Sequence, residues 1–327
     1  MKRILIAVLS LLLVFSISSC ASKNSGIESV NTNTAQTPNI QIVSQGTLGG
    51  SERNVYIDSN VGFVDASTDL SETFPVYINA YSYGQEGPLY EVTDLLRTTV
   101  TDNLSRYLGY LYDDFSPEQA AFSSDPGREY EVYYANNSTE VRSLMNSISV
   151  LSTEYAISND ITAPELLDNM LVKAAISYLG LTEPVVTQTT EYNNDGRENL
   201  RTYVITEKAS TTLQKIFNHS FACVTVKKYV DSEDTVVQIG DVSTDELTKY
   251  ADYPVLSYTS VLSKLGSYYP NMDTKDVKTE IYYSATVQPG YFFPCYRFYI
   301  KDGVTTKSDG NLYTIVDVLM TDKSVGD

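Results

Sequence analysis

The strand-like segments of this chain follow one another in pairs, with only short polar turns between the members of a pair. A short turn joins antiparallel neighbours, whereas a parallel pair needs a crossover of a dozen or more residues. We therefore expect antiparallel sheets, which excludes the parallel βαβ repeats of large solute-binding folds. The expected pairs are 129–135 with 140–151, 185–192 with 200–207, and 221–230 with 235–239, and strands at 277–286, 291–300 and 312–320 follow.

Four segments carry apolar residues at helical spacing, and each precedes strands. The clearest is one continuous apolar stripe from Leu166 to Leu179. Thr162 and Glu165 form a capping box before it, and Gly180 ends it. The succession of a helix and antiparallel strands, repeated about four times, predicts an α+β fold of tandem helix-plus-antiparallel-sheet modules. The other helices are expected at about 90–112, from about 210, and from the N-cap Ser257 to Gly266.

The N-terminus has a basic head, Lys2 and Arg3, followed by an apolar run over 4–15 and the sequence Ile17-Ser18-Ser19-Cys20. The apolar run is too short to span a bilayer, which takes about 20 residues. An ordinary secretory peptide would end in an A-x-A-like site rather than a cysteine. The segment resembles the signal peptide and lipobox of bacterial lipoproteins. This resemblance implies that residues 1–19 are removed, that Cys20 carries a lipid, and that the protein is extracytoplasmic and anchored to the bacterial membrane.

Residues 20–51 are rich in Ser, Asn, Thr and Gly, and we expect a flexible tether there. Within it, Ile40 and Ile42 alternate with Gln41, a pattern that would begin an edge strand. Beyond the tether, the expected modules cover 52–155, 156–245 and 246–327.

The formal net charge is −18 over 327 residues, and no basic run occurs. A nucleic-acid-binding protein needs a basic surface, so no nucleic-acid partner is expected. An anionic lipid surface would repel this body, so the lipid itself has to hold it at the membrane.

The chain contains 27 tyrosines and no tryptophan. Tyrosine suits half-buried sheet surfaces, and the alternative is an exposed aromatic platform for a glycan or a peptide.

The sequence contains no catalytic constellation, and we predict no catalytic, cofactor-binding or metal-binding residues. His219 is the only histidine, and Cys223 and Cys295 lack the spacing of zinc ligands. The two cysteines are either buried free thiols or a disulfide. The adjacent carboxylates of Asp113 and Asp114 would serve a glycosidase only if the fold brought two acids together across a substrate.

The C-terminal part carries a second resemblance. Residues 253–258, Tyr-Pro-Val-Leu-Ser-Tyr, enter a helix, and residues 292–298, Phe-Phe-Pro-Cys-Tyr-Arg-Phe, lie in a strand. Over about 250–320 this resembles the PepSY-like and YycH/YycI-like extracytoplasmic modules of Gram-positive bacteria, whose fold is PepSY- or cystatin-like. The resemblance implies regulatory protein binding, such as inhibition of a peptidase or modulation of a sensor kinase, and no chemistry.

Alternation places Tyr296, Phe298 and Ile300 against the helix, with Arg297 and Tyr299 facing out. Pro294 is expected at an edge or at the start of a strand, because it cannot donate a ladder hydrogen bond. The sequence therefore predicts a lipoprotein that binds an extracytoplasmic protein or peptide without catalysis. The alternatives are a glycan- or small-ligand-binding lipoprotein and, less favoured, a hydrolase.

Overall fold

The computed structural model describes residues 40–48, 53–56, 64–65, 67–79, 94–125, 128–144, 147–193, 197–240, 247–288, 290–302 and 312–321. The chain divides into two units, Met1–Gln36 and Thr37–Asp327, and every described residue belongs to the second. The predicted signal peptide over 1–19, the predicted lipid carrier Cys20 and most of the predicted tether lie outside the described residues.

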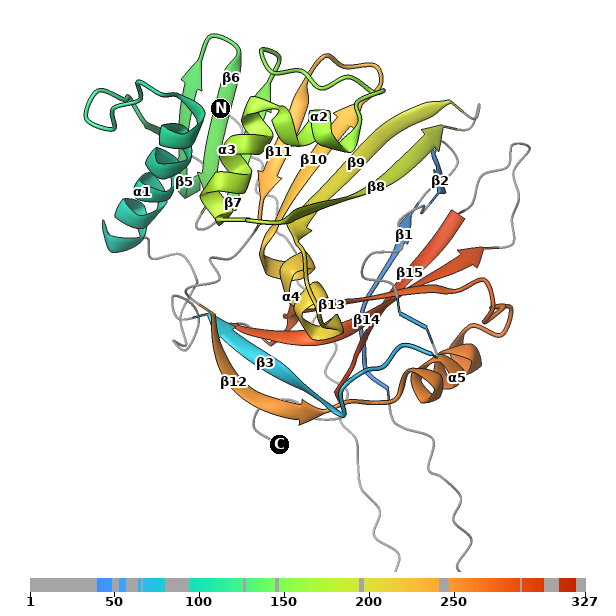
Figure 1. The fold of residues 1–327 in the computed structure, drawn as a ribbon. Helices are drawn as coiled ribbons and strands as arrows, with labels where there is room; N and C mark the ends of the chain where they lie inside the picture. The colour runs from blue at the N-terminus through green and yellow to red at the C-terminus, as the bar shows by residue number, and fades with distance from the viewer. Residues whose placement is uncertain are drawn as a thin grey trace, which may run out of the picture. The chain divides into compact units, whose positions relative to one another are not determined.

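A nine-stranded antiparallel sheet combines strands from both sides of residue 155 (Figure 1). The expected hairpins β8–β9 and β10–β11 are confirmed, and each pairs along nearly its full length. The strand order is β2-β8-β9-β10-β11-β7-β6-β5-β4. The bounds are β2 Arg53–Tyr56, β4 Ser123–Asp125, β5 Arg128–Asn136, β6 Thr139–Leu144, β7 Ser147–Ser152, β8 Pro184–Asn193, β9 Glu198–Glu207, β10 Cys223–Tyr229 and β11 Thr235–Ile239.

Helices α1 (Asp94–Leu111) and α3 (Met170–Leu179) cover one face of this sheet (Figure 1). Their apolar stripes are buried against strand residues such as Val226 and Val237. The two helices are also joined directly, because the buried hydroxyl of Tyr107 donates a hydrogen bond to the carbonyl of Leu171 at 3.2 Å.

Two segments expected to be continuous are broken. The predicted strand 140–151 is two strands, β6 and β7, which pair with each other as a hairpin. The predicted helix is α2 (Ala163–Asp168) followed by α3, because Asn169 adopts an extended conformation between them and its side chain accepts a hydrogen bond from the Leu171 N–H. A capping asparagine thus starts a second helix within one apolar stripe. Gly180, in the left-handed conformation, ends α3 as predicted.

A six-stranded antiparallel sheet contains the C-terminal strands (Figure 1). Its order is β1-β15-β14-β3-β12, and β13 pairs with β14. β1 is an edge strand, as the alternation around Gln41 predicts, although it lies within the range that the sequence assigns to the tether. The bounds are β1 Ile42–Leu48, β3 Thr73–Asn79, β12 Leu247–Pro254, β13 Lys278–Gln288, β14 Tyr291–Asp302 and β15 Leu312–Leu319.

Strand β14 has the predicted register. Tyr296, Phe298 and Ile300 are buried in one cluster with Val261 and Leu265 of α5 (Tyr258–Tyr268). The N-cap Ser257 is confirmed, because its hydroxyl accepts a hydrogen bond from the Ser260 N–H, but α5 continues two residues past Gly266.

The expectation for Pro294 is wrong, because this proline lies inside a central strand. On one side β14 pairs with β3 at Tyr291 and Phe292 and with β15 from Cys295 onward. Pro294 falls between these two ladders, at a position where neither ladder requires its missing N–H donor.

Arg297 faces away from the α5 cluster, as predicted, but it forms part of an ion-pair network. Its guanidinium donates two hydrogen bonds to the Asp317 carboxylate, at 2.8 and 3.0 Å, and lies 4.1 Å from the centroid of the Tyr282 ring. The hydroxyls of Ser44 and Tyr282 also donate to Asp317. Burial raises the pKa of Asp317, but these hydrogen bonds outweigh it and hold the pKa below its usual value.

The predicted α+β fold of tandem PepSY- or cystatin-like modules is wrong. Two large antiparallel sheets dominate the described residues, and each draws its strands from distant parts of the chain. β3, for example, pairs with β12 and β14 rather than with a strand near it in sequence. A strand edge carries unpaired N–H and C=O groups, and a strand from any part of the chain can pair with them. The order of the strands along the sequence therefore did not determine which strands share a sheet.

Candidate functional site

A row of polar side chains crosses the nine-stranded sheet near one end of its central strands. Directly opposed residues of antiparallel strands point to the same face. Arg201 of β9 is opposite Lys228 of β10, and Lys228 is opposite Thr235 of β11. Thr235 is in turn opposite Ser152 of β7. We call this set the polar row, and its members are Thr190, Arg201, Lys228, Thr235, Ser152 and Thr139.

The polar row lies on the helix-covered face of the sheet. On these strands, the residues two positions from Arg201, Lys228 and Thr235 are Tyr203, Val226 and Val237. These three belong to the core beneath α1 and α3. Side chains two residues apart on a strand share a face. Lys228 is accordingly only 6% exposed, and Thr235 is fully buried. The sequence thus places an ammonium group where strand alternation would place an apolar residue.

The connection from β7 to α2, residues 153–161, is attached to the polar row. The Ile157 N–H donates a buried hydrogen bond to the Thr235 hydroxyl at 3.0 Å, and the Glu154 N–H donates to the Ser152 hydroxyl at 3.2 Å. Ile157 is itself 1% exposed. The row therefore supplies hydrogen-bond partners for two backbone N–H groups of this connection, including that of the buried Ile157.

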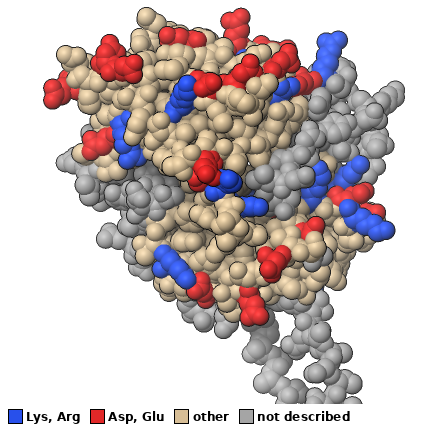
Figure 2. All heavy atoms as spheres, in the orientation of Figure 1, with Lys and Arg blue, Asp and Glu red and all other residues tan. Residues whose placement is uncertain are grey.

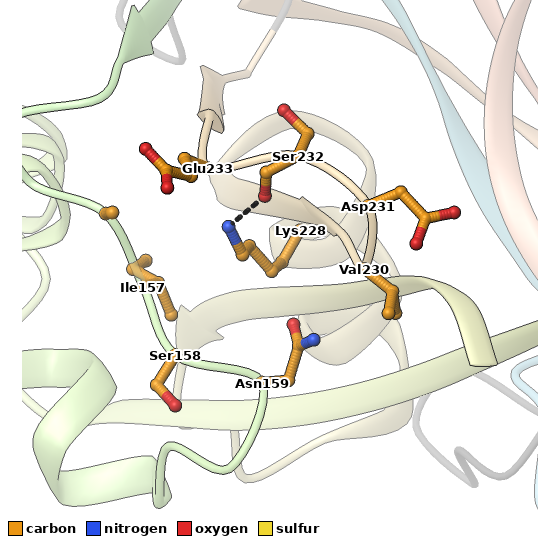
Figure 3. Close-up of a pocket in the computed structure, with 9 residues that line it drawn as sticks. Ile157, Ser158, Asn159, Lys228, Val230, Asp231, Ser232 and Glu233 are labelled. Carbon is orange, nitrogen blue, oxygen red and sulfur yellow. Dashed lines mark hydrogen bonds between the residues drawn. The ribbon is translucent and has the colours of Figure 1, made fainter.

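An open cleft of about 510 Å³ lies between this connection and the β10–β11 turn. Figure 3 shows the Lys228 side chain at its centre, with its ammonium group donating a hydrogen bond to the Ser232 carbonyl. The Asn159 amide points toward the same space (Figure 3). The lining residues are Ala156, Ile157, Ser158, Asn159, Lys228, Val230, Asp231, Ser232 and Glu233.

Three buried polar atoms associated with this end of the sheet have no hydrogen-bond partner among the described residues: Asn159 Oδ1, Glu198 Oε1 and Arg201 Nε. Arg201 Nη2 forms an ion pair with Glu198 Oε2. Burial lowers the pKa of Arg201, but the Glu198 hydrogen bond, with Coulombic contributions that include Asp160, raises it above its usual value. An unpaired buried polar atom costs about 1–3 kcal/mol, so the site has unused hydrogen-bonding capacity.

The cleft has a charged and polar lining. Its lining combines one buried cation with the exposed carboxylates of Asp231 and Glu233, and it contains no cysteine or histidine. No cluster of three or more potential metal ligands occurs among the described residues.

Among the described residues, no helix has the length and apolar character needed to cross a membrane. Figure 2 shows acidic side chains spread over the visible face, with Lys and Arg scattered singly among them.

The residues considered in the sequence as chemical candidates are not brought together. Cys223 and Cys295 form no disulfide and lie in different sheets, and burial raises the pKa of the Cys295 thiol. His219 lies in the last turn of α4 (Thr212–Phe221), and Asp113 and Asp114 are exposed after α1.

Sequence reasoning missed Lys228, Arg201 and Asn159. The available signal was the alternation Val224, Val226, Lys228, which puts a lysine on the buried face of β10.

Searches against protein-family models, curated proteins and solved structures found no match to this chain. The likenesses to lipoproteins and to PepSY-like modules therefore remain predictions from the sequence.

Proposed function

We propose that this protein is a lipid-anchored, extracytoplasmic binding protein without catalytic activity, whose ligand is a peptide or a peptide segment of a protein. The observation that carries the proposal is the cleft. Its lining includes the buried Lys228 ammonium group and the Asn159 amide, whose buried oxygen has no hydrogen-bond partner among the described residues, and it has no nucleophile with an adjacent base. Peptides offer the alternating donors and acceptors that such a site can satisfy.

The glycan-binding alternative is less well supported. Glycan sites usually include an aromatic ring on which a sugar stacks, and no residue lining the cleft is aromatic. Many of the tyrosines lie instead in sheet surfaces and cores, where their rings pack against one another, as for Tyr258 with Tyr296 at 5.9 Å.

Photocrosslinking tests the proposed function. A benzophenone side chain in place of Ser158, which is exposed and lines the cleft, is expected to form covalent adducts with a random tetrapeptide mixture. The same group in place of Glu118, which is exposed but does not line the cleft, is the control and should give far fewer adducts. Equal labelling at both positions would contradict a peptide site at the cleft. Competition by an oligosaccharide mixture, with none by unlabelled peptide, would favour the glycan alternative.

Lipidation of Cys20 is a separate prediction that rests on the sequence alone. Replacing Cys20 with alanine should release the protein from the membrane fraction or leave its signal peptide uncleaved, because the acyl chains anchor it at about 0.8 kcal/mol per buried CH₂. Membrane fractionation and the mass of the mature N-terminus measure both effects. A Cys20→Ala protein that is cleaved and still fully membrane-bound would exclude lipid anchoring at this residue.

A further inference from the structure

We infer that the cleft recognises the free α-carboxylate of a peptide whose last side chain is cationic. This inference rests on the proposed function and specifies the chemistry of its ligand. It follows from a buried positive charge at the centre of the cleft, a negatively charged rim and an unpartnered acceptor beside them.

Lys228 supplies the positive charge at the centre. Its ammonium group has three protons, and one of them is donated to the Ser232 carbonyl. Lys228 is only 6% exposed, so little water solvates its charge. The neutral carbonyl of Ser232 compensates only part of this lost hydration. A carboxylate entering the cleft would replace the missing hydration with a charge-assisted hydrogen bond.

The acidic residues at the rim of the cleft disfavour ligands that carry more than one negative charge. Asp231 and Glu233, which line the cleft, are exposed on the β10–β11 turn. Inorganic phosphate or a phosphorylated group would bring a charge of about −1.5 to −2 close to these carboxylates. A ligand with one carboxylate inside and a cationic group outside fits both the centre and the rim.

Asn159 adds a directional contact. Its Oδ1 atom is buried and has no hydrogen-bond partner among the described residues. The Asn159 and Lys228 side chains both line the cleft, and the amide points toward the space beside the Lys228 side chain (Figure 3). In a peptide, the last backbone N–H lies next to the terminal carboxylate and can donate to this oxygen while the carboxylate meets Lys228.

Calorimetric titration of the full-length protein in detergent with acetyl-alanyl-lysine, bearing a free carboxylate, tests the inference. We expect the C-terminal amide of this peptide, and acetyl-alanyl-glutamate, each to bind at least tenfold more weakly. The Lys228→Met protein should also bind the probe at least tenfold more weakly. Lys227→Met is the matched control, because Lys227 is adjacent on β10 but faces the opposite side of the sheet, and its affinity should stay within twofold.

A second variant keeps the test decisive if Lys228→Met does not fold. The double substitution Asp231→Asn and Glu233→Gln changes exposed turn residues only, and it should reduce the preference for lysine over glutamate to less than threefold. Equal binding of the acid and the amide by the wild-type protein would overturn the inference, as would unchanged affinity in a folded Lys228→Met protein. Peptide adducts at position 158 that do not depend on a free carboxylate would overturn it while leaving the proposed function intact. The absence of any peptide adduct would refute both.

Discussion

Replacing Phe298 with alanine is expected to lower the free energy of unfolding by about 3–5 kcal/mol, the usual cost of truncating a buried phenylalanine. The Phe298 side chain is fully buried, and its ring lies 6.2 Å from that of Tyr258 and 5.8 Å from that of Tyr296, measured between centroids. The cavity would open between the central strand β14 and helix α5, where both elements are fixed by other contacts. Urea-induced unfolding of the two proteins measures the loss.

Tyr268→Ala is the matched control for this substitution. It also truncates an aromatic residue in this region, but Tyr268 is 53% exposed on α5, and its loss should cost no more than about 0.5 kcal/mol. Equal effects of the two substitutions would show that α5 does not pack on β14 as described.

Arg297→Ala is expected to cost about 3–5 kcal/mol at neutral pH, because it leaves the Asp317 carboxylate buried without its cation. The side chain of Asp317 is 2% exposed, so its carboxylate depends on hydrogen bonds from protein groups. From the sequence alone, in which Arg297 faces outward, a small effect would be expected unless Arg297 pairs with a buried acid. The size of the effect therefore tests whether the pair with Asp317 exists.

The pH dependence separates this mechanism from a simple loss of packing. The folded pKa of Asp317 lies below its unfolded value, about 3.9, so the stabilisation is present above that pH and is lost as the pH falls through the folded pKa. In Arg297→Ala, burial instead favours the protonated acid. The difference in unfolding free energy between wild type and variant should shrink between pH 7 and pH 3. A difference that stays constant over this range would contradict the ion-pair explanation. Lys301→Ala is the control, because Lys301 is an exposed cation on the same strand, and its replacement should change the free energy of unfolding little at either pH.

Only part of the candidate site could be predicted from the sequence. The apolar alternation that predicted β10 also placed Lys228 on its buried face. Arg201 was not predictable as a partner, because it becomes a neighbour of Lys228 only through the register between β9 and β10. Asn159 belongs to a connection without periodicity, and only its attachment to the polar row through Ile157 brings it to the cleft.

The sequence by itself determined the local features of this protein: the hairpins β8–β9 and β10–β11, the caps at Ser257 and Gly180, and the face of β14 that carries Phe298. Turn chemistry, capping and side-chain alternation act within about ten residues, so a local stretch of sequence is sufficient to specify them. Only the tertiary structure decided which hairpins share a sheet, that β3 joins β12, and that Arg297 meets Asp317. Backbone hydrogen bonds between strands are the same for every sequence, so the partner of a strand edge depends on the packing of the whole chain.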